Sequence, residues 1–235
     1  TLTEGRLVLA GCEPAPGLDA GALVALAAAS VRGDSVDPMD LALAAATAAR
    51  TGVRIGGVLF TEDRRREYAL LRLPDGDRLG VLKGAPETVL ARCLLDPAAL
   101  QHWQDRARAL AGDGAKVIAC ARKSLATDAD PAIEPESGFA PVGLLAFADP
   151  LRAGVRDALQ ACLAAGIRVV MVTGDHPATA AAIARQVGLG AGRPEVVTLD
   201  DDPGAPLPAL DAADVVARAT PRHKLALVQA LQASG

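Results

Sequence analysis

The 235-residue sequence has few aromatic side chains: phenylalanine, tryptophan and tyrosine make up 2% of it, although 51% of the residues are hydrophobic. Its core must therefore be built mostly from alanine, valine and leucine. Long apolar runs are also missing, because residues 20–30 and 41–49 both fall short of the ~20 residues that cross a bilayer. No basic stretch leading into an apolar one opens the chain, so we expect no signal peptide and a soluble polypeptide.

Excess positive charge is absent too, since the formal net charge is −4. This balance excludes a basic nucleic-acid-binding or membrane-surface protein, and we expect no nucleic-acid partner. The four cysteines, Cys12, Cys93, Cys120 and Cys162, form no C-x-x-C pair. They predict small buried residues in a reducing compartment, and no structural zinc site. The length suffices for one large domain or two smaller ones.

The first part of the chain predicts an antiparallel sheet with helices packed on it. Asp37 is suited to cap a helix that begins with Pro38, and Asp75-Gly76 is typical of a hairpin turn. A stretch rich in aspartate, proline and glutamate, residues 127–139, predicts a surface loop. The strand patterns span residues 6–10, 53–60, 67–73, 79–83, 116–121 and 142–148, and the helical ones 19–31, 38–50, 86–93 and 97–111.

After Asp149-Pro150 helical and strand patterns alternate regularly. Near-continuous apolar strands between helices predict a parallel, doubly wound sheet. The arrangement resembles a nucleotide-handling α/β sheet that lacks its first strand. Helices are expected at 154–165, 178–187 and 221–232, and strands at 167–172, 196–199 and 214–217.

A polar tip, Thr173-Gly174-Asp175, follows the first apolar run of this second region. Ligands bind at such carboxyl ends of parallel strands, and the free N–H groups of a following helix hold anions such as phosphate. Thr173 offers a hydroxyl, Gly174 lets a ligand approach the backbone, and Asp175 can orient the site. Taken alone, the three residues could equally be a helix-capping turn.

A second polar group occurs in the first region. Lys83-Gly84 ends a strand pattern, and Pro86 suits the first turn of a helix. A cation beside a tight turn suits a nucleotide. Phe60 precedes the charged run 61–67; the alternative is a core phenylalanine followed by solvated charges.

Longer motifs carry a family resemblance. The segment 173–180, Thr-Gly-Asp-His-Pro-Ala-Thr-Ala, resembles the TGDxxxTA signature of P-type ATPases, and Asp149-Pro150-Leu151-Arg152 is similar to their DPPR hinge. The segment 217–224 resembles the one that ends in a functional lysine, here Lys224. The resemblance implies that Thr173, Gly174, Asp175 and Lys224 serve catalysis around the transferred phosphoryl group, and that Asp149 and Arg152 belong to a hinge. The alternative for Lys224 is a solvated lysine on a helix face.

Lys83-Gly84-Ala85-Pro86-Glu87 matches the KGAPE signature of the nucleotide-binding domain of these ATPases. The family resemblance implies that Phe60 stacks on adenine, that Asp40 faces its amino group, and that Arg65 and Lys116 face phosphates. Glu62 and Glu67 depart from the family's pattern. The alternatives are an ordinary first-turn acid for Asp40 and plain solvent exposure for Lys116. These motifs resemble the calcium, sodium/potassium, magnesium and proton pumps more than the heavy-metal pumps.

The opening residues Thr1–Gly5 resemble the tail of the family's DKTGTLT signature, whose nucleophilic aspartate would lie four positions before Thr1. The GDGxND motif, which supplies a magnesium ligand, would follow Gly235. We therefore expect this polypeptide not to autophosphorylate and not to hold catalytic Mg²⁺, so no metal site is assigned, while ATP is expected to bind.

The resemblance implies an antiparallel-sheet nucleotide-binding domain, residues 5–148, inserted into a partial haloacid dehalogenase-like parallel α/β domain, residues 1–4 and 149–235. The full-length protein would be a cation pump in the cell membrane that hydrolyses ATP through an aspartyl phosphate, and this part would be cytoplasmic. Two other functions stay open: a standalone nucleotide-binding or regulatory module, and a haloacid dehalogenase-type phosphatase. The phosphatase is disfavoured because no strand ending in D-x-D precedes Thr173.

Overall fold

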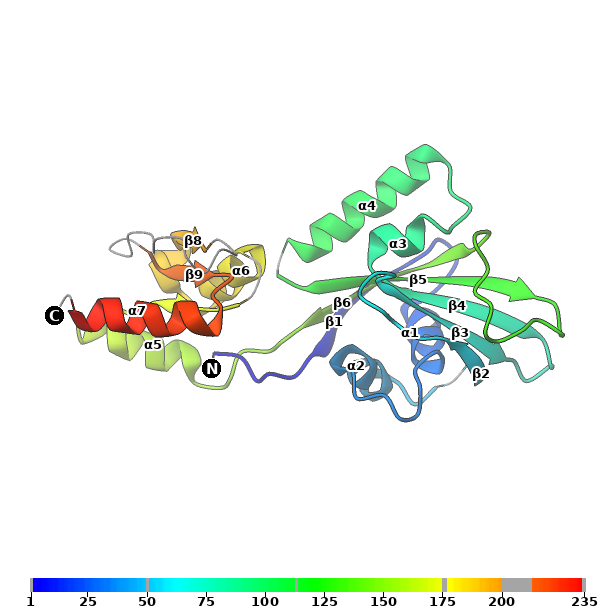
Figure 1. The fold of residues 1–235 in the computed structure, drawn as a ribbon, viewed down its shortest axis with the longest axis horizontal. Helices are drawn as coiled ribbons and strands as arrows, with labels where there is room; N and C mark the ends of the chain where they lie inside the picture. The colour runs from blue at the N-terminus through cyan, green and yellow to red at the C-terminus, as the bar shows by residue number, and fades with distance from the viewer. Residues whose placement is uncertain (1, 50, 113, 175–176, 200–212, 234–235) are drawn as a thin grey trace. The chain divides into compact units, whose positions relative to one another are not determined.

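The computed structural model describes residues 2–49, 51–112, 114–174, 177–199 and 213–233 (Figure 1). The chain divides into two compact units. The larger unit contains residues 3–111 and 115–150, and the smaller contains residues 151–235 together with 1–2 and 112–114. Each unit has its own sheet, with hydrophobic core clusters packed on it.

The larger unit is built on a six-stranded sheet of order β1-β6-β5-β4-β3-β2. Every neighbouring pair is antiparallel, which confirms the predicted antiparallel sheet. From β2 to β6 consecutive strands lie side by side, and β1 returns to the far edge beside β6. The strands are β1 (Val8–Pro14), β2 (Val53–Val58), β3 (Arg66–Arg72), β4 (Arg78–Gly84), β5 (Lys116–Leu125) and β6 (Ala140–Ala148).

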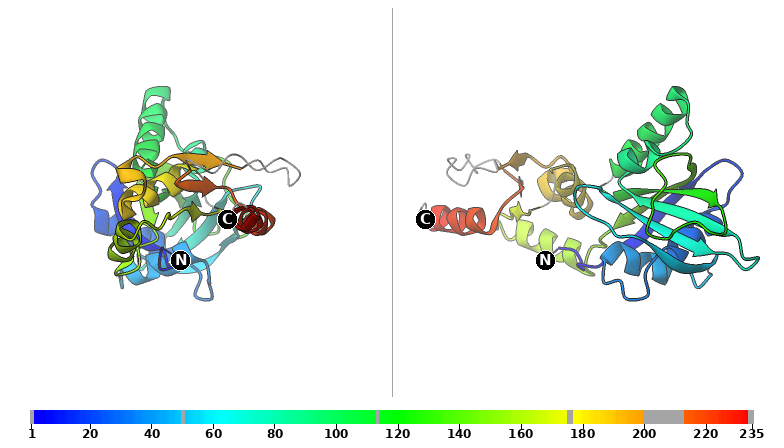
Figure 2. Two further views of the ribbon diagram at one scale, coloured as in Figure 1. Left: turned by 90° about the vertical axis from the view of Figure 1, so that its left-hand side faces the viewer. Right: turned by 45° about the vertical axis from the view of Figure 1, so that its right-hand side comes forward.

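Helices cover both faces of this sheet, as Figure 1 and the right-hand view of Figure 2 show. One core lies under α1 (Ala20–Ala29) and α2 (Pro38–Ala46), and the other under α3 (Pro86–Leu90) and α4 (Pro97–Ala111). Strand alternation divides the side chains between them: on β3, Ala69 and Leu71 face the first core, and Tyr68 and Leu70 face the second. The sheet is therefore buried on both faces.

Local signals fix where the first helices begin. The carboxylate of Asp19 accepts the N–H of Ala22 at 2.8 Å and caps α1. The carboxylate of Asp37 accepts the N–H of Met39 at 2.8 Å, and Pro38 opens α2, as the sequence predicts. Such caps contribute about 1 kcal/mol each.

Several predicted ends were wrong. The helix expected over 38–50 ends at Ala46, because the Thr47 hydroxyl accepts the N–H of Ala49 at 3.0 Å and turns the backbone out of the helix. The strand expected over 6–10 runs from Val8 to Pro14, because pairing with β6 continues to Gly143. Likewise β5 continues to Leu125, which lies opposite the first residue of β4. Pairing partners distant in the sequence decide both strands.

The smaller unit holds a three-stranded parallel sheet of order β7-β9-β8. On β9, Val215 and Ala217 pack with α5 and α6, and Val216 packs with Leu227 of α7. Helices thus cover both faces, which matches the predicted doubly wound arrangement. The elements are α5 (Val155–Ala164), β7 (Met171–Val172), α6 (Pro177–Val187), a 3₁₀ turn (Leu189–Gly192), β8 (Val196–Thr198), β9 (Val215–Ala217) and α7 (Pro221–Ala233). The strand expected over 167–172 contains only its last two residues, since β9 opposes only those.

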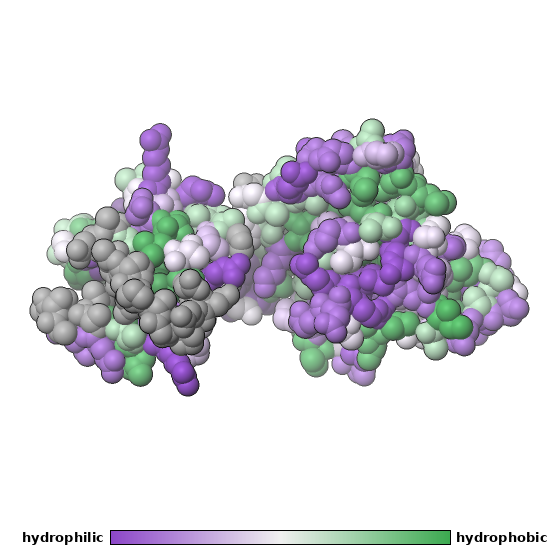
Figure 3. Space-filling model, turned by 45° about the horizontal axis from the view of Figure 1, so that its top comes forward, coloured by the Kyte–Doolittle hydropathy of each residue, from purple (hydrophilic) through white to green (hydrophobic). Residues whose placement is uncertain are grey.

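The surface of the larger unit mixes residue types. On the face seen in Figure 3, hydrophilic residues gather across its middle, with hydrophobic residues on either side. Within the described ranges, no helix combines the length and the apolarity that crossing a membrane requires.

Candidate functional site

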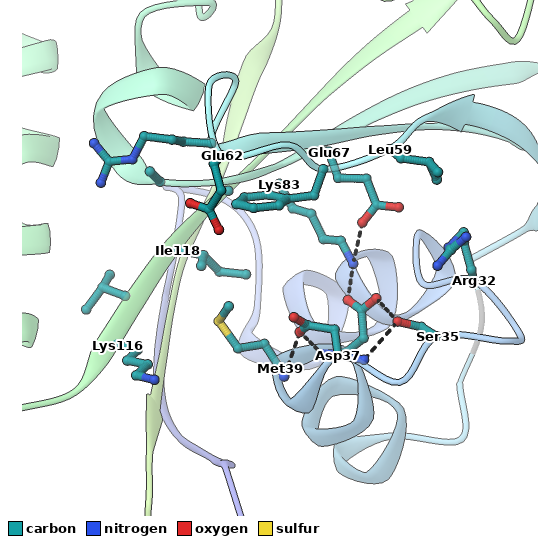
Figure 4. A pocket seen from close by; sticks show the side chains of 16 residues that line it. Arg32, Ser35, Asp37, Met39, Leu59, Glu62, Glu67, Lys83, Lys116 and Ile118 are labelled. Carbon is teal, nitrogen blue, oxygen red and sulfur yellow. Dashed lines mark hydrogen bonds and ion pairs between the residues drawn. The ribbon is translucent and has the colours of Figure 1, made fainter. Parts of the chain in front are cut away.

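The larger unit contains a cavity of about 790 Å³. It is lined by the loop before α2, the first turn of α2, the turn after β2 and the facing ends of β3, β4 and β5 (Figure 4). The fold brings together here all six residues that the sequence assigns to nucleotide binding. They are Asp40, Phe60, Arg65, Lys83, Gly84 and Lys116.

Asp40 lies in the first turn of α2, where the Asp37 cap and Pro38 fix the start of the helix. Its side chain is only 9% exposed. One carboxylate oxygen accepts the hydroxyl of Ser35 at 2.6 Å, and the other accepts the ammonium of Lys83. Asp40 is therefore a held acceptor facing a cavity, which an ordinary solvated first-turn acid is not.

Lys83 reaches from β4 toward α2, as Figure 4 shows. Besides Asp40, its ammonium lies 3.3 Å from the second carboxylate oxygen of Glu67. Lys83 and Glu67 occupy directly opposite positions of the β3–β4 pair. Opposite charges in such positions attract, and here both side chains are at most a tenth exposed.

Arg54 on β2 extends this network. Its guanidinium donates to the first carboxylate oxygen of Glu67 at 2.8 Å and also to the carbonyl of Ser30. Two cations, Arg54 and Lys83, thus alternate with two carboxylates, Glu67 and Asp40. The buried charges balance, which is the condition under which a protein can bury them.

Sequence reasoning missed this network. It assigned Glu67 only as a departure from the family pattern and gave Arg54 and Ser35 no role. A signal was present: Glu67 and Lys83 carry opposite charges on the two strands of the predicted hairpin. Arg54 could not be found in that way, because its link to Glu67 depends on how β2 pairs with β3.

Gly84 is tightly enclosed by its own chain. Its φ is +155°, and an added Cβ would lie 2.4 Å from the carbonyl oxygen of Arg65 and 2.5 Å from the Cα of Arg66. The next residue, Ala85, donates its N–H to the carbonyl of Arg65 at 2.9 Å. The glycine was expected to let a ligand approach; here it lets two segments of the pocket wall approach one another.

The turn after β2 carries Phe60 and Arg65. Phe60 is 51% exposed, so the alternative of a core phenylalanine is wrong. Arg65 adopts a positive φ of 52°, and its N–H donates to the carbonyl of Thr61 at 2.7 Å. Its guanidinium contacts Glu87 at 2.8 Å, and both side chains are more than half exposed. Exposed pairs of this kind contribute little, so Arg65 can exchange Glu87 for another anion at small cost.

Lys116 begins β5 on the far side of the cavity from Arg32 in Figure 4. Its side chain is exposed and has no ion pair among the residues that the structure describes. The two predicted phosphate-facing cations, Arg65 and Lys116, therefore lie at the exposed rim, whereas Lys83 lies in the buried floor. Cys120, directly opposite Lys83 on β5, is fully enclosed, and burial raises the pKa of its thiol to about 12.

The smaller unit places Thr173 and Gly174 just beyond the end of β7. The N–H of Thr173 donates to Val216 at 2.9 Å, and its carbonyl accepts the N–H of Ala219 at 2.9 Å. An added Cβ on Gly174 would lie 3.6 Å from the carbonyl oxygen of Ala219, and the residue is exposed. The ends of β7 and β9 thus meet at one edge of the sheet, as parallel strands require. Asp175 lies outside the described residues.

Lys224 lies in the first turn of α7, which follows that same edge. It is exposed, and its N–H donates to the carbonyl of Thr220 at 3.0 Å. Thr220 caps the helix, since its hydroxyl accepts the N–H of His223 at 3.2 Å while Nδ1 of His223 accepts the N–H of Thr220 at 3.3 Å. This reciprocal cap, which sequence reasoning missed, fixes the start of the turn that carries Lys224.

The segments around Asp149 and Arg152 pair with the beginning of the chain. In the larger unit, the carboxylate of Asp149 accepts the N–H groups of Gly5 at 2.9 Å and Arg6 at 3.1 Å. In the smaller unit, the N–H of Arg152 donates to the carbonyl of Leu2 at 2.9 Å. The two passages of the chain at residues 2–6 and 149–152 are therefore cross-linked by hydrogen bonds.

In the described part of the chain, no three histidine, cysteine, aspartate or glutamate side chains are grouped as a metal ion requires.

Comparison with known proteins supplies the family. A model of the haloacid dehalogenase-like hydrolases matches residues 40–235. The chain is 38% identical over 201 residues to a probable cation-transporting ATPase I of Mycobacterium tuberculosis (strain ATCC 25618 / H37Rv), covering 78% of this chain and 12% of that protein. It is 31% identical over 196 residues to calcium-transporting ATPase 1 of Bacillus cereus, covering 77% and 22%. It is 34% identical over 159 residues to the sodium/potassium-transporting ATPase subunit alpha-1 of Catostomus commersonii, covering 58% and 16%.

The chain therefore spans between about an eighth and a quarter of the length of these relatives. The family match covers more than half of the chain and includes the part of the cavity lining from Asp40 onward and the tip of β7. The chain belongs to the haloacid dehalogenase-like hydrolases and is homologous over much of its length to the cation-transporting P-type ATPases.

Proposed function

We propose that the cavity binds the adenine nucleotide used by a cation-transporting P-type ATPase. The single observation that carries the proposal is the convergence of Asp40, Phe60, Arg65, Lys83 and Lys116 on one cavity from separate segments of the chain. The relatives are cation-transporting ATPases by name, which supports the same class for the full-length protein.

The lining suits the parts of a nucleotide. Phe60 offers a half-exposed aromatic face on which a base can stack, an interaction of about 1–3 kcal/mol. The carboxylate of Asp40 has lone pairs beyond the two used by Ser35 and Lys83, so it can also accept a hydrogen bond from the amino group of adenine. Arg65 and Lys116 lie at the exposed rim, where phosphate groups can stay hydrated while they pair with a cation.

The second group supports the phosphoryl-transfer half of the proposal. Thr173 and Gly174 lie at the carboxyl edge of the parallel sheet, and α7 with Lys224 begins beside them. We propose that Thr173 and Gly174 hold the transferred phosphoryl group, that Lys224 neutralises its charge, and that Asp175 orients the site. The γ-phosphoryl group of ATP would pass to an aspartate and then to water, and this cycle would drive cation movement.

We further propose that residues 5–148 are a nucleotide-binding domain inserted between residues 1–4 and 149–235 of the phosphorylation domain. Asp149 and Arg152 would stabilise the paired connection between the two, about which closure delivers the nucleotide. The full-length pump would lie in the cell membrane with this part in the cytoplasm. The sequence of 235 residues contains neither DKTG nor GDGxND, so we expect this polypeptide alone to show no Mg²⁺-dependent ATP hydrolysis.

Calorimetric titration of the 235-residue protein with ATP and ADP tests the proposal. We expect binding, and about tenfold or greater weakening in Phe60→Ala, from the lost stacking energy. Leu94→Ala is the matched control, because Leu94 is a 77% exposed hydrophobic residue outside the cavity. The Leu94→Ala protein should bind ATP and ADP with the affinity of the wild-type protein. Lys83→Ala should also weaken binding, provided that its circular dichroism shows a folded protein. Absence of binding at millimolar ATP, or equal binding by Phe60→Ala, would contradict the proposal.

A further inference from the structure

Glu134 lies in the acidic loop that the sequence predicts to be a solvated surface segment, yet its side chain is only 9% exposed. Its carboxylate lies between two guanidinium groups, one from the turn after β2 and one from the first residue of β3. One oxygen accepts Nε of Arg66 at 2.7 Å, and the other accepts Nη2 of Arg64. Glu134 therefore joins two segments that are about seventy residues apart in the sequence.

These arginines flank the residue that lines the cavity. Arg64 and Arg66 turn toward Glu134, and Arg65 between them reaches the cavity and Glu87. Arg64 also donates from Nη1 to the carbonyl of Leu59 at 2.7 Å, which is the peptide that leads into Phe60. Arg66 donates from Nη1 to the carbonyl of Arg64 at 3.2 Å. A chain of contacts thus runs from Glu134 through Arg64 to the backbone of Phe60.

The loop that carries Glu134 is itself anchored. Pro131 packs so closely on Gly56 of β2 that an added Cβ there would lie 2.4 Å from the Cβ of Pro131. Lys123 donates to the carbonyl of Ser137 at 2.6 Å, and Arg92 donates to the carbonyl of Glu136 at 2.7 Å. Glu134 consequently has a fixed position on the sheet from which it can hold the turn.

We propose that Glu134 is a positioning residue for the cavity: by pairing with Arg64 and Arg66 it holds the turn so that Phe60 is presented to the cavity. The inference rests on the proposed nucleotide function. Without the carboxylate charge, two guanidinium groups that are 24% and 13% exposed would face each other without a counter-ion. Arg64 would then move toward solvent and no longer donate to the carbonyl of Leu59. The backbone that leads into Phe60 would lose this hydrogen bond, so the Phe60 side chain would no longer be held in position at the cavity.

The test is calorimetric titration of the 235-residue protein with ADP. Glu134→Gln preserves size and removes the charge, and we expect about tenfold weaker binding, equivalent to about 1.4 kcal/mol. Glu134→Asp should recover part of the affinity. The control is Glu136→Gln, two positions along the same loop, where the side chain is exposed and unpaired within the described residues; it should bind like wild type.

A double-variant comparison separates positioning from general stability. If Glu134 acts through Phe60, Glu134→Gln should weaken ADP binding less than about twofold when Phe60→Ala is already present. A full tenfold loss in that background would overturn the inference, and so would wild-type affinity in folded Glu134→Gln. If Glu134→Gln fails to fold, Arg64→Gln tests the same link from its other end. Failure of the wild-type protein to bind ADP would instead overturn the proposed function.

Discussion

Lys83 on β4 and Asp40 on α2 form an ion pair across the floor of the cavity, with side chains that are 7% and 9% exposed. Glu67 shares the same ammonium at 3.3 Å. Lys83, the lysine of the KGAPE motif, is thus paired with two carboxylates and is not a free cation waiting for phosphate. Lys83 therefore lies at the buried end of the cavity, whereas Arg65 and Lys116, the cations that we propose to face phosphate, lie at its exposed rim.

The first prediction concerns the stability of this floor. Lys83→Met should lower the free energy of unfolding by about 3 kcal/mol, because two buried carboxylates lose a shared cation. Urea unfolding followed by the fluorescence of Trp103, the single tryptophan and a buried residue of the larger unit, would measure it. Lys116→Met removes an exposed lysine instead and should change stability by less than about 0.5 kcal/mol. Equal stabilities of the two variants would show that the floor network contributes nothing.

Gly84 gives a second prediction. Gly84→Ala should destabilise the larger unit by about 3 kcal/mol and weaken nucleotide binding, because the new Cβ would push Arg65 and Arg66 away from β4. Gly11→Ala is the matched control, since a Cβ on that strand glycine meets no atom within 4 Å. Thermal unfolding and ADP titration of both variants are the measurements. A stable Gly84→Ala protein with normal affinity would refute the close-approach explanation.

Asp149 gives a third prediction. Asp149→Ala should speed amide hydrogen exchange at Gly5 and Arg6 by about tenfold or more, because both N–H groups lose a charged acceptor. Asp149→Asn keeps one acceptor oxygen and should lie between Asp149→Ala and wild type. Asp128→Ala, in the loop before β6, should leave exchange at both amides unchanged. Unaltered protection in Asp149→Ala would mean that the carboxylate does not hold the two passages of the chain together.

The cysteines give a pH-dependent prediction. Burial raises the pKa of Cys93 to about 11 and that of Cys120 to about 12. The thiolate is the reactive form, so a higher pKa leaves less of it: at pH 8 the reactive fraction of Cys93 should be about 100-fold below that of an ordinary thiol. Alkylation by iodoacetamide should therefore be slow at both residues, become faster as the pH rises toward 11, and become fast at pH 8 in urea. Mass spectrometry of tryptic peptides would measure the extent of alkylation at each cysteine. Rapid labelling of either residue in the folded protein at pH 8 would contradict the prediction.

Local chemistry explains which features were predictable from sequence. Asp37 and Pro38 start α2 where expected, and short apolar runs on either side of Asp75-Gly76 indicate β3 and β4. These signals act through contacts between residues that are only a few positions apart in the sequence. Phe60, Lys83 and Gly84 were recognised as candidates because they lie in motifs that are contiguous in the chain, although no single motif shows that Asp40 or Lys116 joins them.

Pairing between distant segments explains what was not predictable. The strand β1 extends to Pro14 because β6 supplies its partner, and Glu134 leaves solvent because Arg64 and Arg66 lie opposite the loop. From the sequence, Glu67 is a departure from the family pattern that would disturb the cavity. In the fold, β2 places Arg54 beside Glu67, and the ion pair neutralises the carboxylate.

The sequence by itself determined the two kinds of sheet, the helix starts and the residues proposed to bind a nucleotide, because hydrophobic period, caps and short motifs act locally. Only the tertiary structure decided which charges are buried together and which remain at the rim. That decision belongs to the fold because the free energy of a charge depends on the partners and the solvent around it, and these are set by chain segments far apart in the sequence.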